Sequence, residues 1–102
     1  MAFKNGMRPV HPGEVLREEY LEPMGLSVNA LAKRLAIPAS RLNDVVLQRR
    51  GVTPDTALRL ARYFGTDARS WLNLQCAHDL RIAEMAHSKE IQKAIEPMLE
   101  SA

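Results

Sequence analysis

The residues from Ser40 to Asn43 have side chains that could read base edges in the major groove of duplex DNA. Ser40 can donate or accept a hydrogen bond, Arg41 can bond O6 and N7 of guanine together, and Asn43 can bond N6 and N7 of adenine. Each bidentate contact discriminates between bases by about 1–3 kcal/mol. Asp44 can accept from cytosine, although orienting Arg41 or repelling other sequences fits it better. Phosphate contact and surface solubility are the alternatives for Arg41.

Two short helices separated by a tight turn are expected to hold this segment outward. Apolar residues recur at helical spacing, namely Leu31, Ala32 and Leu35 before the turn, Ile37 within it, and Leu42, Val45 and Val46 after it. Ala32 is expected where the helices cross, because a larger side chain would push them apart. Ser27 can cap the first helix, and Pro38 suits the first turn of the second. This pattern is typical of a helix-turn-helix, although helical hairpins in many other proteins share it.

Positive charge is concentrated on the same stretch. Between Ser27 and Arg50 there are five basic residues and one acidic residue, whereas the whole chain of 102 residues has a formal net charge of +2. Such a patch favours phosphate binding, because each neutralised phosphate releases counterions. An ordinary solvated face is the alternative. The residues expected to contact the DNA backbone are Ser27, Asn29, Lys33, Arg49 and Arg50. Arg34 is expected to pair with an acid elsewhere in the domain.

Further helices are predicted on both sides of this pair. A helix of about ten residues should follow Pro12 and Gly13 and end at Pro23, and Gly25 then permits a turn. Another should begin near Pro54, with Thr53 as its cap and Gly65 at its end. Its expected apolar face consists of Ala57, Leu58, Leu60, Ala61 and Phe64. No strand-like alternation competes, so the expected fold is all-α with about five or six helices.

The C-terminal part is predicted to supply a surface for pairing. A longer helix capped by Thr66 or Asp67 should extend to about Ala86, and a short amphipathic helix should span 88–99, interrupted near its end by Pro97. A helix this short must dock on something or fray. The residues expected at a dimer or partner interface are Trp71, Leu74, Leu80, Ile91, Ile95 and Met98. The alternative is that these residues only close a monomeric core.

Neither catalysis nor metal binding is indicated. His11, His78 and His87 are dispersed, and His78 and its neighbour Asp79 are expected to face different directions. Cys76 is the one cysteine, which excludes an internal disulfide and predicts a small buried hydrophobic side chain in a reducing cytoplasm. No apolar run approaches the roughly 18 residues of a membrane span, and a signal-peptide core is absent. We expect a soluble cytoplasmic protein that is not an enzyme and has no cofactor.

Two longer stretches, HPGEVLREEYLEPMGLSVNALAKRLAIPASRLNDVV and TPDTALRLARYFGTDARSWLNLQCAHDL, resemble the HigA-type antitoxins, also described as VapI-like regulators. The resemblance covers about Arg8 to Ala83. It implies a lambda-repressor-like and Cro-like fold in a bacterial homodimer that binds a palindromic operator in double-stranded DNA. It also implies autorepression of an operon and neutralisation of a RelE-like, HigB-type toxin that cleaves mRNA on the ribosome.

The family's DNA-contacting positions fall on Ser27, Asn29, Pro38, Ala39, Ser40, Arg41, Asn43 and Arg49. Two positions depart from the family pattern. Ala36 stands in the turn where glycine is frequent, which implies a right-handed backbone or mild strain there. Val28 stands where related repressors often place a glutamine against phosphate, so contacts at the first helix are less defined.

The chain is expected to comprise a flexible N-terminal arm (1–10), a helix-turn-helix domain (11–86), and a C-terminal amphipathic helix with a tail (87–102). Three functions fit these observations. The first is a transcription-regulating antitoxin associated with the nucleoid. The second is a stand-alone or phage-type repressor without a toxin. The third is a protein-interaction module in which DNA binding is vestigial.

Overall fold

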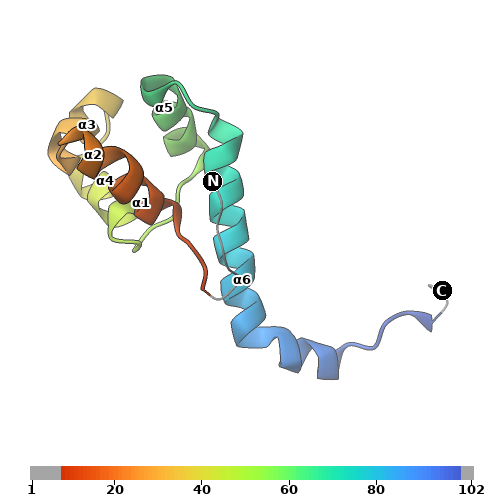
Figure 1. Ribbon diagram of the computed structural model, residues 1–102. Helices are drawn as coiled ribbons and strands as arrows, with labels where there is room; N and C mark the ends of the chain where they lie inside the picture. The colour runs from red at the N-terminus through yellow and green to blue at the C-terminus, as the bar shows by residue number, and fades with distance from the viewer. Residues whose placement is uncertain (1–7, 100–102) are drawn as a thin grey trace.

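The computed structural model describes residues 8–99, and that part of the chain is helical without a strand (Figure 1). This confirms the all-α prediction. The predicted arm lies largely in residues 1–7, outside the described part. In chain order the elements are α1 (Pro12–Val15), the π-helix η1 (Leu16–Leu21), α2 (Glu22–Met24), α3 (Val28–Leu35), α4 (Ala39–Val46), α5 (Pro54–Phe64) and α6 (Ala68–Ala94).

The elements α1, η1 and α2 form one continuous helical segment with a wide middle turn. In η1 the Glu22 N–H bonds the Arg17 carbonyl, the i→i−5 pattern of a π-helix. Pro23 therefore lies inside the last helical turn, and the prediction that the helix ends at Pro23 was wrong. A proline ring clashes with the i−4 carbonyl of a regular α-helix, and the wider spacing relieves that clash. Gly25 ends the segment with φ +61°.

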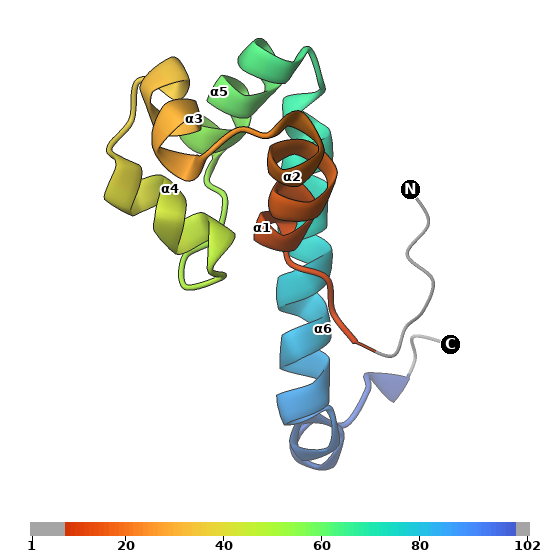
Figure 2. The ribbon, with the colours of Figure 1, turned by 60° about the vertical axis from the view of Figure 1, so that its left-hand side comes forward.

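The predicted helix-turn-helix is present in α3 and α4, which lie side by side across a short turn (Figure 2). Ser27 caps α3, since its Oγ accepts the Ala30 N–H at 3.0 Å. Pro38 is the N-cap of α4, one position before the first turn in which it was expected. Ala36 has φ 58° and ψ 44°, so the backbone at the turn is left-handed and the right-handed alternative is excluded.

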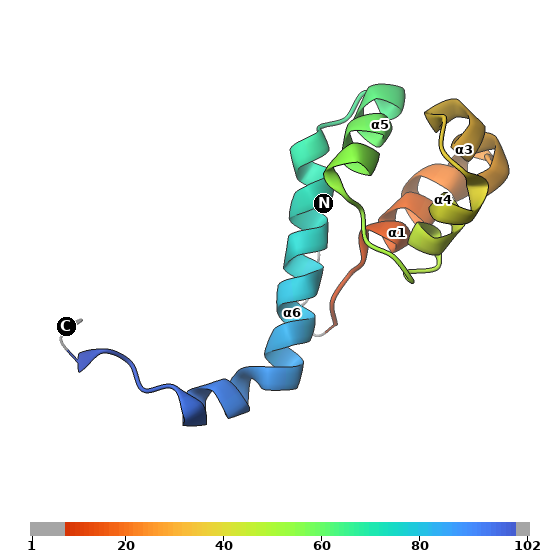
Figure 3. The ribbon, with the colours of Figure 1, turned by 180° about the vertical axis from the view of Figure 1, so that it is seen from behind.

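The C-terminal helices differ from prediction in length. Asp67, rather than Thr66, caps α6. The helix continues beyond Ala86 to Ala94, and a separate helix over 88–99 was a wrong prediction. No helix-breaking residue lies between these positions, whereas Pro97 disfavours helical backbone in the residue before it. The second half of α6 projects away from the other helices (Figure 3). No described helix is long and apolar enough to span a membrane.

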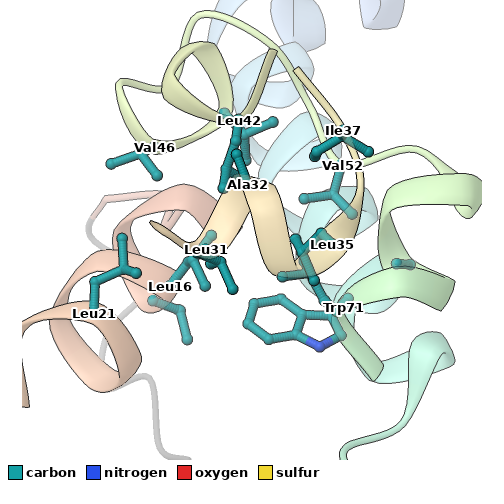
Figure 4. Packing of buried hydrophobic residues seen from close by; sticks show 14 residues of the cluster. Leu16, Leu21, Leu31, Ala32, Leu35, Ile37, Leu42, Val46, Val52 and Trp71 are labelled. Carbon is teal, nitrogen blue, oxygen red and sulfur yellow. The ribbon is translucent and has the colours of Figure 1, made fainter. Parts of the chain in front are cut away.

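The core lies between α3, α4 and the helices that pack behind them (Figure 4). Leu31, Ala32 and Leu42 are almost completely buried, as the sequence predicts for the crossing of α3 and α4. Leu58 was wrongly assigned to the apolar face of α5, because 64% of its surface is exposed. It lies one position beyond Ala57, which is fully buried, and so points away from the interior.

Candidate nucleic-acid interface

The outer face of α4 is largely polar because its large apolar residues point inward. Leu42, Val45 and Val46 are buried in the core, which fixes the rotation of the helix. Ser40 is exposed and Asn43 is partly exposed, so both side chains are accessible from outside. Among the other predicted contact residues, those that are exposed are Ser27, Asn29, Lys33, Pro38, Arg49 and Arg50, and Ala39 is partly buried. The structure thus brings the predicted residues to the surface around one helix.

Arg41 is held by α5 rather than pointing freely outward. Its Nη2 donates to Asp55 Oδ2 and to Thr56 Oγ1, both at 2.8 Å. Its side chain is only 28% exposed. These contacts differ from the expectation that the guanidinium group forks onto guanine. Arg41 instead fixes the first turn of α4 against the first turn of α5.

Arg59 joins the same network to the turn between α3 and α4. Its Nε donates to Asp55 Oδ2 at 2.8 Å, and its Nη1 donates to the carbonyl oxygens of Leu35 at 2.9 Å and Ala36 at 3.2 Å. The hydrogen bond from Arg59, followed by that from Arg41, lowers the pKa of the Asp55 carboxyl. A cation at the C-terminal end of α3 also satisfies carbonyls that the helix leaves unpaired.

The loop after α4 is organised by Asp44. The Asp44 carbonyl accepts the backbone N–H groups of Arg49 at 2.7 Å and Arg50 at 3.2 Å. Its carboxylate accepts from Arg49 Nη2 at 3.0 Å and Nε at 3.3 Å. Asp44 therefore orients Arg49, and the prediction that it orients Arg41 was wrong. Arg49 lies close to Asp44 because the backbone at Gln48 is left-handed, with φ 64°, and turns the chain back toward Asp44.

Arg34 does not pair with an acid in the way the sequence analysis expected. Its Nη1 donates to the Tyr63 hydroxyl at 2.9 Å, and its guanidinium carbon lies 5.8 Å from the centroid of the same ring. The one carboxylate on α5, that of Asp55, is already shared by Arg41 and Arg59. Arg34 thus contributes to the packing of α3 on α5.

Three expectations about histidine and cysteine were wrong. The His11 and His78 rings lie edge to face with centroids 4.8 Å apart, because α1 packs on α6. His78 Nδ1 lies 3.1 Å from Asp79 Oδ1, although the two residues are adjacent. Cys76 is exposed rather than buried, since it lies on the outer face of α6. Within residues 8–99, no group of three or more His, Cys, Asp or Glu side chains could hold a metal ion.

The predicted interface residues divide into buried and exposed groups. Trp71 is 3% exposed and packs against Tyr20 at 5.5 Å between ring centroids, so it belongs to the core and its assignment to an interface was wrong. Leu74 is partly buried against the same core. The exposed members are Leu80 (58%), Ile91 (51%), Ile95 (62%) and Met98 (74%). Met85, which sequence analysis did not single out, is exposed in the same region, as is Leu99 at the end of the predicted amphipathic segment.

Sequence reasoning also missed the role of Asp55, Thr56 and Arg59. Asp55 lies in the first turn of α5, where an acid is expected only to favour the positive end of the helix. The i,i+4 spacing of Asp55 and Arg59 could have signalled their ion pair. Nothing in the spacing signals the contact of Arg41 with α5, which depends on how the helices pack.

Comparisons with known proteins agree with this geometry. A helix-turn-helix family model matches residues 18–71. The chain is 64% identical over 83 residues to virulence-associated protein I of Dichelobacter nodosus, covering 81% of this chain and 77% of that protein. It is 34% identical to antitoxin HigA-1 of Vibrio cholerae, covering 96% and 91% respectively. The solved Pseudomonas aeruginosa antitoxin HigA with the higBA promoter has a TM-score of 0.87 and 46% identity, covering 89% and 99%.

Proposed function

Because this chain belongs to the helix-turn-helix family that includes HigA antitoxins and virulence-associated protein I, we propose that it is an antitoxin that binds DNA and represses its own operon. The observation that carries the proposal is the outer face of α4. Ser40 and Asn43 are accessible there, Leu42, Val45 and Val46 are buried, and basic residues flank the helix. The fold resembles that of an antitoxin solved with promoter DNA at 46% identity. As a regulator of transcription it acts at the bacterial nucleoid in the cytoplasm, and no catalytic step is assigned to it.

DNA recognition divides between base reading and backbone contacts. Ser40 and Asn43 on α4 enter the major groove and contact base edges. The backbone contacts come from both ends of the motif, at Ser27, Asn29, Lys33, Pro38, Ala39, Arg49 and Arg50. Arg41 is a positioning residue in this scheme, because Asp55 and Thr56 hold its guanidinium group.

A comparison of two variants tests this division. Asn43→Ala should lower the affinity for the operator by more than that for random DNA and should relax preference at one base pair, at a cost of about 1–3 kcal/mol. Arg41→Ala should weaken binding to both DNAs by the same factor, since it loosens α4 without removing a base contact. Competition binding against single-base operator variants gives both results. If Arg41→Ala, and not Asn43→Ala, lost the preference at one base pair, Arg41 would be a base-contacting residue.

Homodimerisation follows from the limited reach of one recognition helix. One such helix reads only a few base pairs, and two copies about 34 Å apart read a palindrome. The exposed apolar residues at the end of the chain, Leu80, Ile91, Ile95 and Met98, supply the pairing or toxin-binding surface. Deletion after Ala86 should damage dimerisation or toxin binding more than folding, because residues there are mostly exposed. Unchanged dimer mass and unchanged toxin affinity in that truncation, which retains Leu80, would exclude the part of this surface beyond Ala86.

The toxin partner distinguishes the proposal from its two alternatives. A RelE-like protein encoded beside this chain should co-purify with it and lose its mRNA-cleaving activity in the complex. Footprinting of the purified antitoxin on the operon's promoter should show two protected half-sites. A protected promoter without a neighbouring toxin supports a stand-alone repressor, and toxin binding without any footprint supports an interaction module.

A further inference from the structure

The loop that carries Arg49 and Arg50 is anchored to α6 by one side chain. The backbone N–H of Val52, near the end of this loop, donates to Gln75 Oε1 at 2.7 Å. Val52 itself is 4% exposed, and a buried amide that loses its acceptor is destabilising. Gln75 lies in the first half of α6, far along the chain from the recognition unit. This hydrogen bond therefore helps to fix the position of the loop relative to α6.

Gly51 makes the close approach possible. A Cβ atom built on Gly51 would lie 2.9 Å from the Gln75 side-chain amide carbon and 3.0 Å from both its oxygen and its nitrogen. Gly51 does not have the positive φ that Gly25 and Gly65 have, so backbone conformation does not require a glycine here. The absence of a side chain at position 51 serves the contact with Gln75.

The other end of the Gln75 amide is also fixed, which sets its orientation. Its Nε2 donates to Asp79 Oδ1 at 2.9 Å, and the same oxygen lies 3.1 Å from His78 Nδ1. Because a carboxylate accepts only from a donor, the amide nitrogen must face Asp79 and the oxygen must face Val52. The His78 ring in turn packs on His11, whose Nδ1 accepts the Gly13 N–H at 2.8 Å at the start of α1.

We propose that Gln75 is a positioning residue for operator binding, which holds the loop so that Arg49 and Arg50 reach the DNA phosphates. This inference rests on the proposed function. It also defines a route from α6 to the DNA surface, since any partner that shifts the first half of α6 moves Gln75 and the loop together. By linkage, DNA binding then alters the affinity of that partner by the same factor.

Matched substitutions at position 75 test the contact. Gln75→Met keeps the length of the side chain but removes the acceptor, and we expect operator affinity to fall by about tenfold. The slope of the logarithm of the binding constant against the logarithm of the salt concentration should become shallower by roughly 1–2, because each lost phosphate contact reduces the magnitude of this slope by about 0.9. Gln75→Glu keeps the acceptor for Val52 but sets a second carboxylate against Asp79, so it is combined with Asp79→Asn, whose amide can donate to the new carboxylate; the salt slope of this double variant should match wild type. An unchanged slope in a folded Gln75→Met variant would overturn the proposal.

A double-mutant cycle keeps the proposal testable if Gln75→Met fails to fold. Gly51→Ala should weaken operator binding and flatten the salt slope in the wild-type background, because the new methyl group displaces Gln75. It should have no further effect in a Gln75→Ala background, where the space is open. Additive effects would overturn the proposal. Failure of the wild-type protein itself to bind its promoter would instead refute the proposed function, so the two failures are distinguishable.

Discussion

Replacement of Ala36 by glycine should stabilise the protein, because Ala36 is held in a conformation that disfavours L-residues. Its φ of 58° and ψ of 44° are left-handed, and such a backbone costs an alanine roughly 1–2 kcal/mol. Glycine avoids that cost but loses about 0.4–1 kcal/mol through greater freedom in the unfolded chain. The Ala36 methyl group is exposed, so its loss removes little buried surface. Ala36→Gly should therefore raise the free energy of unfolding by about 0.5–1 kcal/mol.

Gly25→Ala is the matched substitution, and it should lower the free energy of unfolding instead of raising it. Gly25 has φ 61°, and no heavy atom lies within 4 Å of a Cβ built there. Backbone conformation alone should then determine the effect, and we expect a loss of about 0.5–1 kcal/mol. Both residues end a helix in the same left-handed conformation, so the pair separates backbone strain from side-chain packing.

Urea unfolding followed by circular dichroism measures both changes, with the m-value as the check that the unfolded state is unaltered. A change of 1 kcal/mol should move Tm by about 4–8 °C in a domain of this size. DNA affinity should stay constant in Ala36→Gly, since Arg59 already fixes the carbonyls at the turn. A neutral or destabilised Ala36→Gly beside a destabilised Gly25→Ala would refute the assignment of strain to Ala36.

Three further predictions concern packing and pH. Burial, followed by the neighbouring His78, lowers the pKa of His11 from its ordinary value of 6.5, so the free energy of unfolding should fall as pH drops below about 6.5. His11→Asn keeps a capping acceptor and should remove this pH dependence, and a persistent pH dependence in that variant would contradict the assignment to His11. Gly13→Ala should destabilise by about 1–3 kcal/mol in urea unfolding, because the new Cβ would overlap the Val45 carbonyl of α4, and a neutral result would exclude that contact. Leu42→Ala should cost about 2–5 kcal/mol, measured in the same way, since Leu42 is completely buried, and a loss below about 1 kcal/mol would be inconsistent with that burial.

Local signals in the sequence were sufficient for most of the secondary structure. Ser27 and Thr53 cap the helices they precede, and Gly25 and Gly65 end helices with the positive φ expected of glycine there. Each of these features depends on neighbours in the chain, so residue type and spacing determine it. The extent of α6 was underestimated because a polar stretch such as that around Ser88 contains no positive signal for either continuation or termination.

Side-chain partners were less predictable than elements. The contact of Arg41 with Asp55 joins two helices, and its formation depends on a packing angle that spacing does not encode. The proximity of His11 and His78 arises in the same way from the packing of α1 on α6. The outward polar face of α4 was predictable, because the buried positions of Leu42 and Val45 determine the rotation of the whole helix.

The wide turn of η1 and the proline that follows it constitute a compensating pair. Leu16 and Leu21 are five positions apart, yet both are buried, at 0% and 5% exposed. A regular α-helix aligns residues four apart, so the extra residue of the wide turn is what brings both leucines to the core. Removing one exposed glutamate between them while also replacing Pro23 with alanine would yield an ordinary amphipathic helix with both leucines still inward. Removing the glutamate alone would set the Pro23 ring against a carbonyl of a regular helix, and replacing Pro23 alone would leave a wide turn that no ring requires. Length variation in this helix should therefore accompany exchange of the proline.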